Sequence, residues 1–265
     1  MTTFATPAPS ALRRVGSLAA AETRLLLRNR TAVVNSILLP LLLVAAIPML
    51  GLDTDALGVD LLVTAAGVTL VFLTYYNLVT TYVARREDLV LQRMRTGELT
   101  DGQVLAATAV PTLLVTAGQL TLVAAGVAVL GLFPAPVDVV LPALAVVLGA
   151  ALMVVLAAAS SVFTRTPESA QITTLPVVVG ATTLSGLFFP VGVLPEALAT
   201  VARLLPLTPV VELVQLGLSG RTWEGGLVAG ADLWWAALGP LGTLLAWTAI
   251  AAGATVRWFR WAPRR

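Results

Sequence analysis

Charged side chains are concentrated in one short segment, ARREDLVLQRMRTGELTDGQ at residues 84–103, which lies between two long apolar runs. A helix from Arg86 would collect these side chains into two stripes. One stripe would hold Val90, Arg93, Met94 and Glu98 with Leu91 beside it, and the other would present Arg85, Asp88, Gln92 and Arg95. Such a mixed-charge helix can form ion pairs and apolar contacts in a groove of a soluble partner. The alternative is a positively charged loop that only fixes topology, and both interpretations stand.

The residue types that carry most enzyme chemistry are missing. The chain has no Cys and no His, and all 16 of its basic residues are Arg. These absences exclude disulfides, Cys nucleophiles and the commonest general base and metal ligand. A Walker A loop needs a Lys to reach the phosphates, so the chain carries none. We therefore predict that the chain is not an enzyme and that it binds no cofactor or metal itself.

The composition predicts an all-α polytopic membrane protein. Of the 265 residues, 58% are hydrophobic and 11% are charged, whereas soluble domains carry roughly 25% charged residues. A crossing helix needs about 20 residues, which predicts six crossings free of Asp, Glu and Arg, at residues 31–52, 61–83, 104–133, 139–163, 172–189 and 233–256. Thr100 and Asp101 predict the N-terminal cap of the third crossing.

The distribution of Arg predicts the orientation of these crossings. Fourteen Arg residues fall before the first crossing, in the second and fourth connections or in the C-terminal tail, and only Arg203 and Arg221 fall on the other side. Because positively charged loops face the cytoplasm, both termini are expected there, in a multi-pass protein of the plasma or bacterial inner membrane. A net charge of only +2, with the Arg residues beside apolar runs, excludes a nucleic-acid partner.

Three regions follow from this topology. Residues 1–30 form a cytoplasmic N-terminal segment, in which the apolar spacing from about 10 to 29 predicts an amphipathic helix on the membrane lipid. Residues 31–256 form the transmembrane domain, and residues 257–265 form a cytoplasmic tail.

The segment LSGLFFPVGVLPEALATVARLLPLTPVVELVQLGLSG, residues 184–220, is apolar but interrupted by four prolines. Between two of them, EALATVARLL predicts a short helix with Glu196 in its first turn. We expect a pair of external helices, at about 190–220, that enter the outer leaflet and return, since backbone of this kind is viable there only when packed against protein. A peripheral surface loop is the alternative.

A few polar side chains fall within the predicted crossings. They could line a path between subunits or pair one helix with another, and pairing is the favoured interpretation for most of them. The candidates for the path are Thr74, Tyr75, Asn77 and Thr80 in the second crossing and Gln119 in the third.

The order of these features resembles the membrane subunit of type-2 ABC exporters, a family that includes bacterial drug, polysaccharide and lipid-linked glycan export permeases. An N-terminal helix ending in RLLLRNR precedes the first crossing, an Arg/Glu-rich segment follows the second, and SGLFFPVGVLPEALATVARLLPLTPVVEL follows the fifth. This last string is the most specific part. Members of the family often continue the paired charges as RE-x-G-T, whereas this chain has Asp88, Leu89 and Val90 after Arg86 and Glu87.

The resemblance implies a permease subunit that forms the translocation path of a drug-like, lipid or glycan exporter. ATP and Mg would be bound by a separate ATP-binding cassette ATPase, and a second permease subunit would complete a homodimer or heterodimer. The segment 85–99 would be the coupling helix, with Arg85, Arg86, Glu87, Asp88, Gln92, Arg93, Met94 and Arg95 at the ATPase. The external re-entrant helices would form a gate with Phe188, Phe189, Pro190, Pro195, Pro206, Pro209 and Glu212.

A secondary transporter or channel without an ATPase is the rival function. Ion-coupled transport usually leaves ionisable residues at membrane depth. The six predicted crossings contain no Asp, Glu or Arg, which argues against this rival.

Overall fold

The structure is a computed structural model that describes residues 56–96, 99–187 and 195–263, together with seven isolated positions between 16 and 42. The predicted N-terminal helix, the first crossing at 31–52 and the gate residues Phe188, Phe189 and Pro190 lie outside these ranges. Within them the chain is helical and contains no strand, only an isolated bridge between Arg221 and Leu227. The predicted all-α class is confirmed for the described residues.

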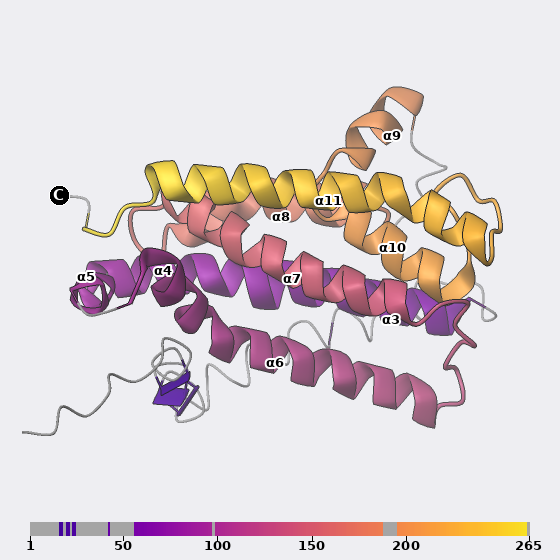
Figure 1. Cartoon of the computed structure of the whole chain (residues 1–265), viewed down its shortest axis with the longest axis horizontal. Helices are drawn as coiled ribbons and strands as arrows, with labels where there is room; N and C mark the ends of the chain where they lie inside the picture. The colour runs from indigo at the N-terminus through magenta and orange to yellow at the C-terminus, as the bar shows by residue number, and fades with distance from the viewer. Residues whose placement is uncertain are drawn as a thin grey trace, which may run out of the picture.

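The longest apolar helix among the described residues runs through three consecutive elements, α3 (Leu57–Val68), the π-helix η2 (Thr69–Tyr76) and α4 (Asn77–Glu87). Together they form a continuous helical span of 31 residues. In its most apolar stretch, 72% of the residues are buried inside the protein. No Pro interrupts this span, and its charged residues lie only near its ends. We call residues 57–87 the central span, because it lies between α6 and α11 in the bundle (Figure 1).

In the part of the chain that the structure describes, three further helices are long and apolar enough to cross a membrane, namely α6 (Asp101–Val129), α7 (Val140–Ser161) and α11 (Ala231–Trp258). The predicted cap of α6 is present: Thr100 Oγ1 accepts a hydrogen bond from the backbone N–H of Gln103, and Gln103 Oε1 accepts one from the N–H of Thr100. This reciprocal pair satisfies backbone donors that the first helical turn leaves open.

The fifth predicted crossing is shorter than the sequence suggested. Helix α8 (Ala170–Leu184) has 15 residues, and it ends before Gly186, whose φ of +79° is a conformation that glycine adopts at little cost. Helices α9 (Glu196–Arg203) and α10 (Thr208–Ser219) follow and meet at 90°. The described residues thus contain four candidate crossings, or five if the bent pair is one span, and the six-crossing count stays a prediction.

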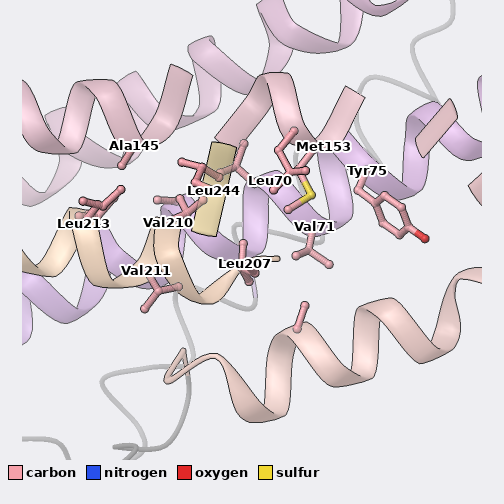
Figure 2. Close-up of a cluster of buried hydrophobic side chains, with 14 of the residues drawn as sticks. Leu70, Val71, Tyr75, Ala145, Met153, Leu207, Val210, Val211, Leu213 and Leu244 are labelled. Atoms are coloured by element: carbon pink, nitrogen blue, oxygen red, sulfur yellow. The ribbon is translucent and has the colours of Figure 1, made fainter. Parts of the chain in front are cut away.

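Part of the core of the bundle forms around α10, which packs against α3, α7 and α11. In Figure 2 its side chains Val210 and Leu213 face Leu70 of the central span, Ala145 of α7 and Leu244 of α11. Many outward-facing side chains are also large and apolar, among them Val147, Ile172, Trp235, Ile250 and Val256. An apolar exterior around an apolar core is what a helix bundle surrounded by lipid requires.

Candidate functional site

Three connections of the chain meet at one end of the bundle. They are the α4–α5–α6 connection, the α7–α8 connection and the C-terminal tail, and Figure 1 shows α4, α5 and the chain end together there. Seven Arg residues that the sequence assigned to the cytoplasm lie in these connections or at the helix ends beside them: Arg85, Arg86, Arg93, Arg95, Arg165, Arg257 and Arg260. We call this end the arginine end.

The charged segment is bent, rather than forming one helix from Arg86. Helix α4 ends at Glu87, and the N–H groups of Asp88 and Leu89 donate to the carbonyls of Ala84 and Arg86. Leu89 has φ +61° and is the one non-glycine residue with a positive φ among the described residues. Helix α5 (Val90–Arg95) then starts in a new direction. A left-handed residue is a common way to end a helix, and glycine is the usual choice; Leu89 stands at the Gly position of the RE-x-G-T pattern.

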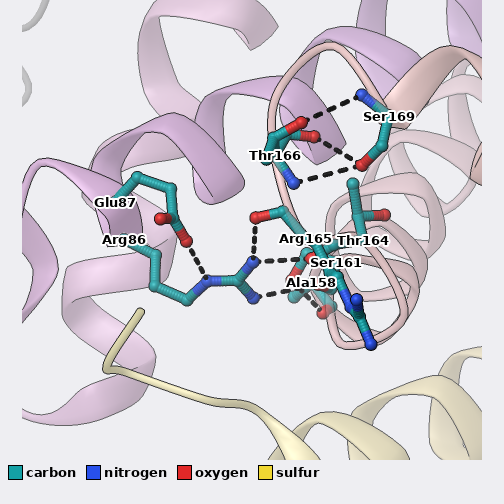
Figure 3. Close-up of polar contacts among 8 residues, drawn as sticks. All are labelled: Arg86, Glu87, Ala158, Ser161, Thr164, Arg165, Thr166 and Ser169. Carbon is teal, nitrogen blue, oxygen red and sulfur yellow. Dashed lines mark hydrogen bonds and ion pairs between the residues drawn. The ribbon is translucent and has the colours of Figure 1, made fainter. Parts of the chain in front are cut away.

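Arg86 points into the protein rather than toward a partner. Its side chain is 1% exposed, and its guanidinium donates to three backbone carbonyls at the end of α7 and just beyond (Figure 3). Nη1 lies 3.0 Å from Ser161 O, and Nη2 lies 2.6 Å from Thr164 O and 3.3 Å from Arg165 O. A carboxylate oxygen of Glu87 lies 3.6 Å from Nε. Arg86 therefore has no surface for an ATPase to contact.

Arg95 also has partners within the chain. Its Nε lies 3.0 Å from a carboxylate oxygen of Asp101 on α6, and its guanidinium lies 5.1 Å from the ring centre of Trp261 in the tail. Trp261 packs edge-on against Phe259, and Phe259 against Tyr82 of α4. These contacts fix α5 to α6 and to the tail, and no feature of the sequence pointed to the role of Trp261.

The remaining predicted coupling residues form the outer surface of the bend. Asp88 and Arg93 are exposed, whereas Arg85, Glu87, Gln92 and Met94 are half-buried. Leu89, which the sequence did not single out, is also exposed, and Leu91 anchors α5 by its complete burial. We call Asp88, Leu89 and Arg93 the corner surface.

Two of the five predicted path residues, Thr74 and Tyr75, pair helices within the chain. The hydroxyls of Thr74 and Thr116 lie 2.9 Å apart, joining η2 to α6, and Tyr75 donates to Ser160 of α7 at 3.0 Å. Thr80 donates to the carbonyl of Tyr76 in its own helix. The assignment of path residues stays a prediction.

Gln119 differs from the other polar residues of the crossings. Its side chain is 3% exposed, and neither its amide nitrogen nor its oxygen has a hydrogen-bond partner among the described residues. The hydroxyl of Thr69, at the start of the π-helix, is likewise buried without a described partner. Buried polar groups of this kind are costly, and π-helices occur frequently at functional sites.

Three of the residues predicted for the external gate are prolines at the ends of α9 and α10. Pro195 precedes α9, Pro206 is buried in the turn between α9 and α10, and Pro209 lies in the first turn of α10, where its missing N–H has no cost. The turn lies against the middle of α11, since Trp247 Nε1 donates to Leu204 O at 2.7 Å. The predicted break of this apolar segment into two helices is thus observed.

A half-buried acid lies on α10. Glu212 is on its first turns, and near it Arg203 of α9 forms an ion pair with Glu224, 3.2 Å apart. The guanidinium of Arg203 also lies 5.8 Å from the ring centre of Trp223. The ion pair between Arg203 and Glu224 thereby connects the loop before α11 to the end of α9. The sequence did not predict this link, because the two residues are 21 positions apart.

The comparison with protein families decides the class of the chain. A family model described as ABC-2 type transporter matches residues 13–218. The chain belongs to the ABC-2 type transporter family. None of the curated proteins matches it. The match extends across the bend, the path candidates and nearly all of α10, and it includes residues 31–52, the predicted first crossing.

An ABC-2 chain is the membrane subunit of a transporter and is not itself catalytic. Family membership and the apolar helices together make this protein a multi-pass membrane permease. Permeases of this family normally work with an ATP-binding subunit, so the surface at which such a subunit could bind is the feature of the permease that bears most directly on its function.

Proposed function

We propose that this ABC-2 permease is the membrane subunit of an ATP-driven exporter, coupled to a separate ATPase that binds ATP and Mg. The observation that carries the proposal is the corner surface: Leu89 and two opposite charges project from a bend that the buried side chains of Arg86 and Leu91 anchor inside the protein. An exposed apolar residue flanked by charges provides both an anchor and electrostatic complementarity for a partner.

The rigid base of the bend supports this assignment. Leu91 is completely buried, Arg95 is paired with Asp101, and α5 has only six residues, so α5 cannot stand alone as a helix. A force applied to the corner surface would therefore pass directly into α4 and the central span. Among the predicted coupling residues, we assign the partner contact to Asp88, Gln92, Arg93 and Met94, with Leu89 added.

The proposed permease has six crossings, with residues 31–52 as the first, and forms a homodimer or heterodimer with a second permease subunit. Helices α9 and α10 are assigned as the external re-entrant pair. Their 90° bend and the contact between the turn and the middle of α11 support a segment that enters the bilayer and returns.

We propose a hydrophobic drug-like, lipid or glycan-type substrate. The middle of each long apolar helix lacks Asp, Glu and Arg, so a path along them would suit a molecule with little charge. The same feature disfavours the rival secondary transporter, which usually needs an ionisable residue at membrane depth. Gln119 and Thr69 have hydrogen-bonding capacity unused by the described residues, and the amide of Gln119 could both donate to and accept from a polar group of the substrate.

The test is purification of the tagged permease from mildly solubilised native membranes, followed by identification of the proteins that accompany it. The expected result is a stoichiometric soluble subunit with a Walker A loop. Recovery of the permease without such a subunit, in detergents that preserve other ABC complexes, would contradict the proposal and favour the secondary transporter.

The proposed orientation can be measured separately because the chain has no native Cys. We expect Glu224→Cys to react with a membrane-impermeant maleimide in intact cells, and Arg93→Cys to react only after permeabilisation. Both side chains are exposed, and Figure 1 shows the segments that carry them, α5 and the connection between α10 and α11, at opposite ends of the bundle, so accessibility within the protein does not bias the comparison. The reverse pattern would place the arginine end outside the cell.

A further inference from the structure

We propose that Arg86 is a positioning residue that locks the α4–α5 bend to the α7–α8 connection, so that the two move as one body. The inference rests on the proposed function, because it assigns Arg86 a role in passing the movement of the ATPase to the bundle. It also changes the role that the sequence suggested for this residue, from contact with the partner to a contact inside the permease.

The geometry matches the chemistry of a guanidinium. The last carbonyls of a helix have no partner within the helix and carry partial negative charge. Ser161 is the last residue of α7, so its carbonyl lies at this helix end, whereas Thr164 and Arg165 belong to the α7–α8 connection just beyond it. The planar fork of Arg can bond several of them at once, whereas the ammonium of Lys has no such fixed geometry.

Burial makes this contact a rigid one. Buried charges persist in proteins when they are paired and hydrogen-bonded, and Arg86 has both the three carbonyls and the nearby carboxylate of Glu87. Its acceptors lie 75 to 79 residues further along the chain. The contact therefore links segments that the chain itself does not hold together.

The Arg86 contact would affect coupling because it joins two segments, the bend and the α7–α8 connection, that continue into different helices of the bundle. The bend continues into the central span through α4, while the α7–α8 connection continues into α7, which packs against α10 and α11. With Arg86 in place, a displacement of the corner surface reaches the central span and α7 together. Without it, the bend can pivot against the α7–α8 connection.

The closing experiment measures this pivot directly. Spin labels are attached at Thr96→Cys and Glu168→Cys, two exposed positions on the two sides of the lock, in the otherwise Cys-free chain. Distances are measured in the isolated permease for the parent, Arg86→Gln, Arg86→Lys and Arg257→Gln. Arg257→Gln is the matched control, because it removes the same charge from an exposed side chain at the same end.

We expect a narrow distance distribution in the parent and in Arg257→Gln, and a clearly broader one in Arg86→Gln. Arg86→Lys keeps the charge but loses the fork, so it should also broaden the distribution, and it serves as the folded variant if Arg86→Gln fails to assemble. An Arg86→Lys distribution as narrow as that of the parent would overturn the lock.

A second measurement uses the complex with its ATPase. In the parent, adding ATP and vanadate should leave the distance between the two labels unchanged, whereas in Arg86→Lys it should shift with nucleotide. A nucleotide-dependent shift in the parent would overturn the lock. Absence of an ATPase from the purified parent would instead defeat the proposed function, and the measurement on the isolated permease would still decide the role of Arg86.

Discussion

Replacing Gly217 with alanine is expected to remove most of the folded permease from the membrane. A Cβ atom added at Gly217 would lie 2.6 Å from Cγ of Pro142, closer still to its Cδ, and 3.0 Å from the carbonyl oxygen of Asp138. A proline ring and a backbone carbonyl cannot rotate away. Overpacking of this kind costs roughly 1–3 kcal/mol or more, against a total stability of about 5–15 kcal/mol. The contact also lies beside the hydrogen bond from Asp138 N–H to Gly217 O, which would be strained.

Gly239→Ala is the matched control for this substitution. Gly239 lies within α11, and an added Cβ there would have no atom within 4 Å. The yield of monodisperse protein and the melting temperature in detergent are the measurements. We expect Gly239→Ala to equal the parent, since alanine is the better helix former, and Gly217→Ala to melt several degrees lower or fail to accumulate. Equal stability of the two variants would show that α10 and α7 are not packed as described.

Reversing the charge of Arg93 is expected to reduce recovery of the ATPase by at least tenfold while leaving the permease folded. Arg93 is exposed on α5 and has no ion pair among the described residues, so its loss leaves the fold intact. A like-charge contact in the interface would oppose binding, and a tenfold loss corresponds to about 1.4 kcal/mol. The measurement is the ratio of ATPase to permease after purification at low and moderate salt, because screening weakens exposed charge contacts.

Arg257→Glu is the control for the charge of the arginine end as a whole. It makes the same reversal on an exposed side chain of α11, and we expect it to retain the ATPase. Equal recovery with Arg93→Glu and with the parent would return α5 to the simpler role of a topology signal. Arg86 is left unchanged here, since a double reversal at Arg86 and Arg93, which the sequence alone would suggest, would mix a folding defect with a docking defect.

The apolar elements of this fold could be predicted from the sequence to within a few residues. The predicted crossing at 61–83 corresponds to the helical span 57–87, and those at 139–163 and 233–256 correspond to α7 and α11. Each is a long apolar run whose ends coincide with charges or turns, so composition alone locates it. The fifth crossing was extended too far because a single glycine, Gly186, is a weak stop signal in an apolar run.

The orientation of the charged side chains could not be predicted in the same way. A single helical register from Arg86 past Leu89, together with the family resemblance, implies the same partner-contacting role for Arg86 and Arg93. Leucine is not a turn-forming residue, and nothing in its type indicates the left-handed conformation that separates α4 from α5. The acceptors of Arg86 are backbone carbonyls, which leave no trace in the sequence.

The partners of the central span have a further consequence for how the permease is made. Thr74 precedes Thr116 by 42 residues, Arg86 precedes Ser161 by 75, and Thr64 precedes Leu187, whose carbonyl it contacts, by 123. At a synthesis rate of roughly 5–20 residues per second, the guanidinium of Arg86 is produced several seconds before its first acceptor. During that interval water or the insertion machinery must satisfy it. The central span, the most buried of the candidate crossings described, is therefore synthesised before the groups that bury it in the complete bundle.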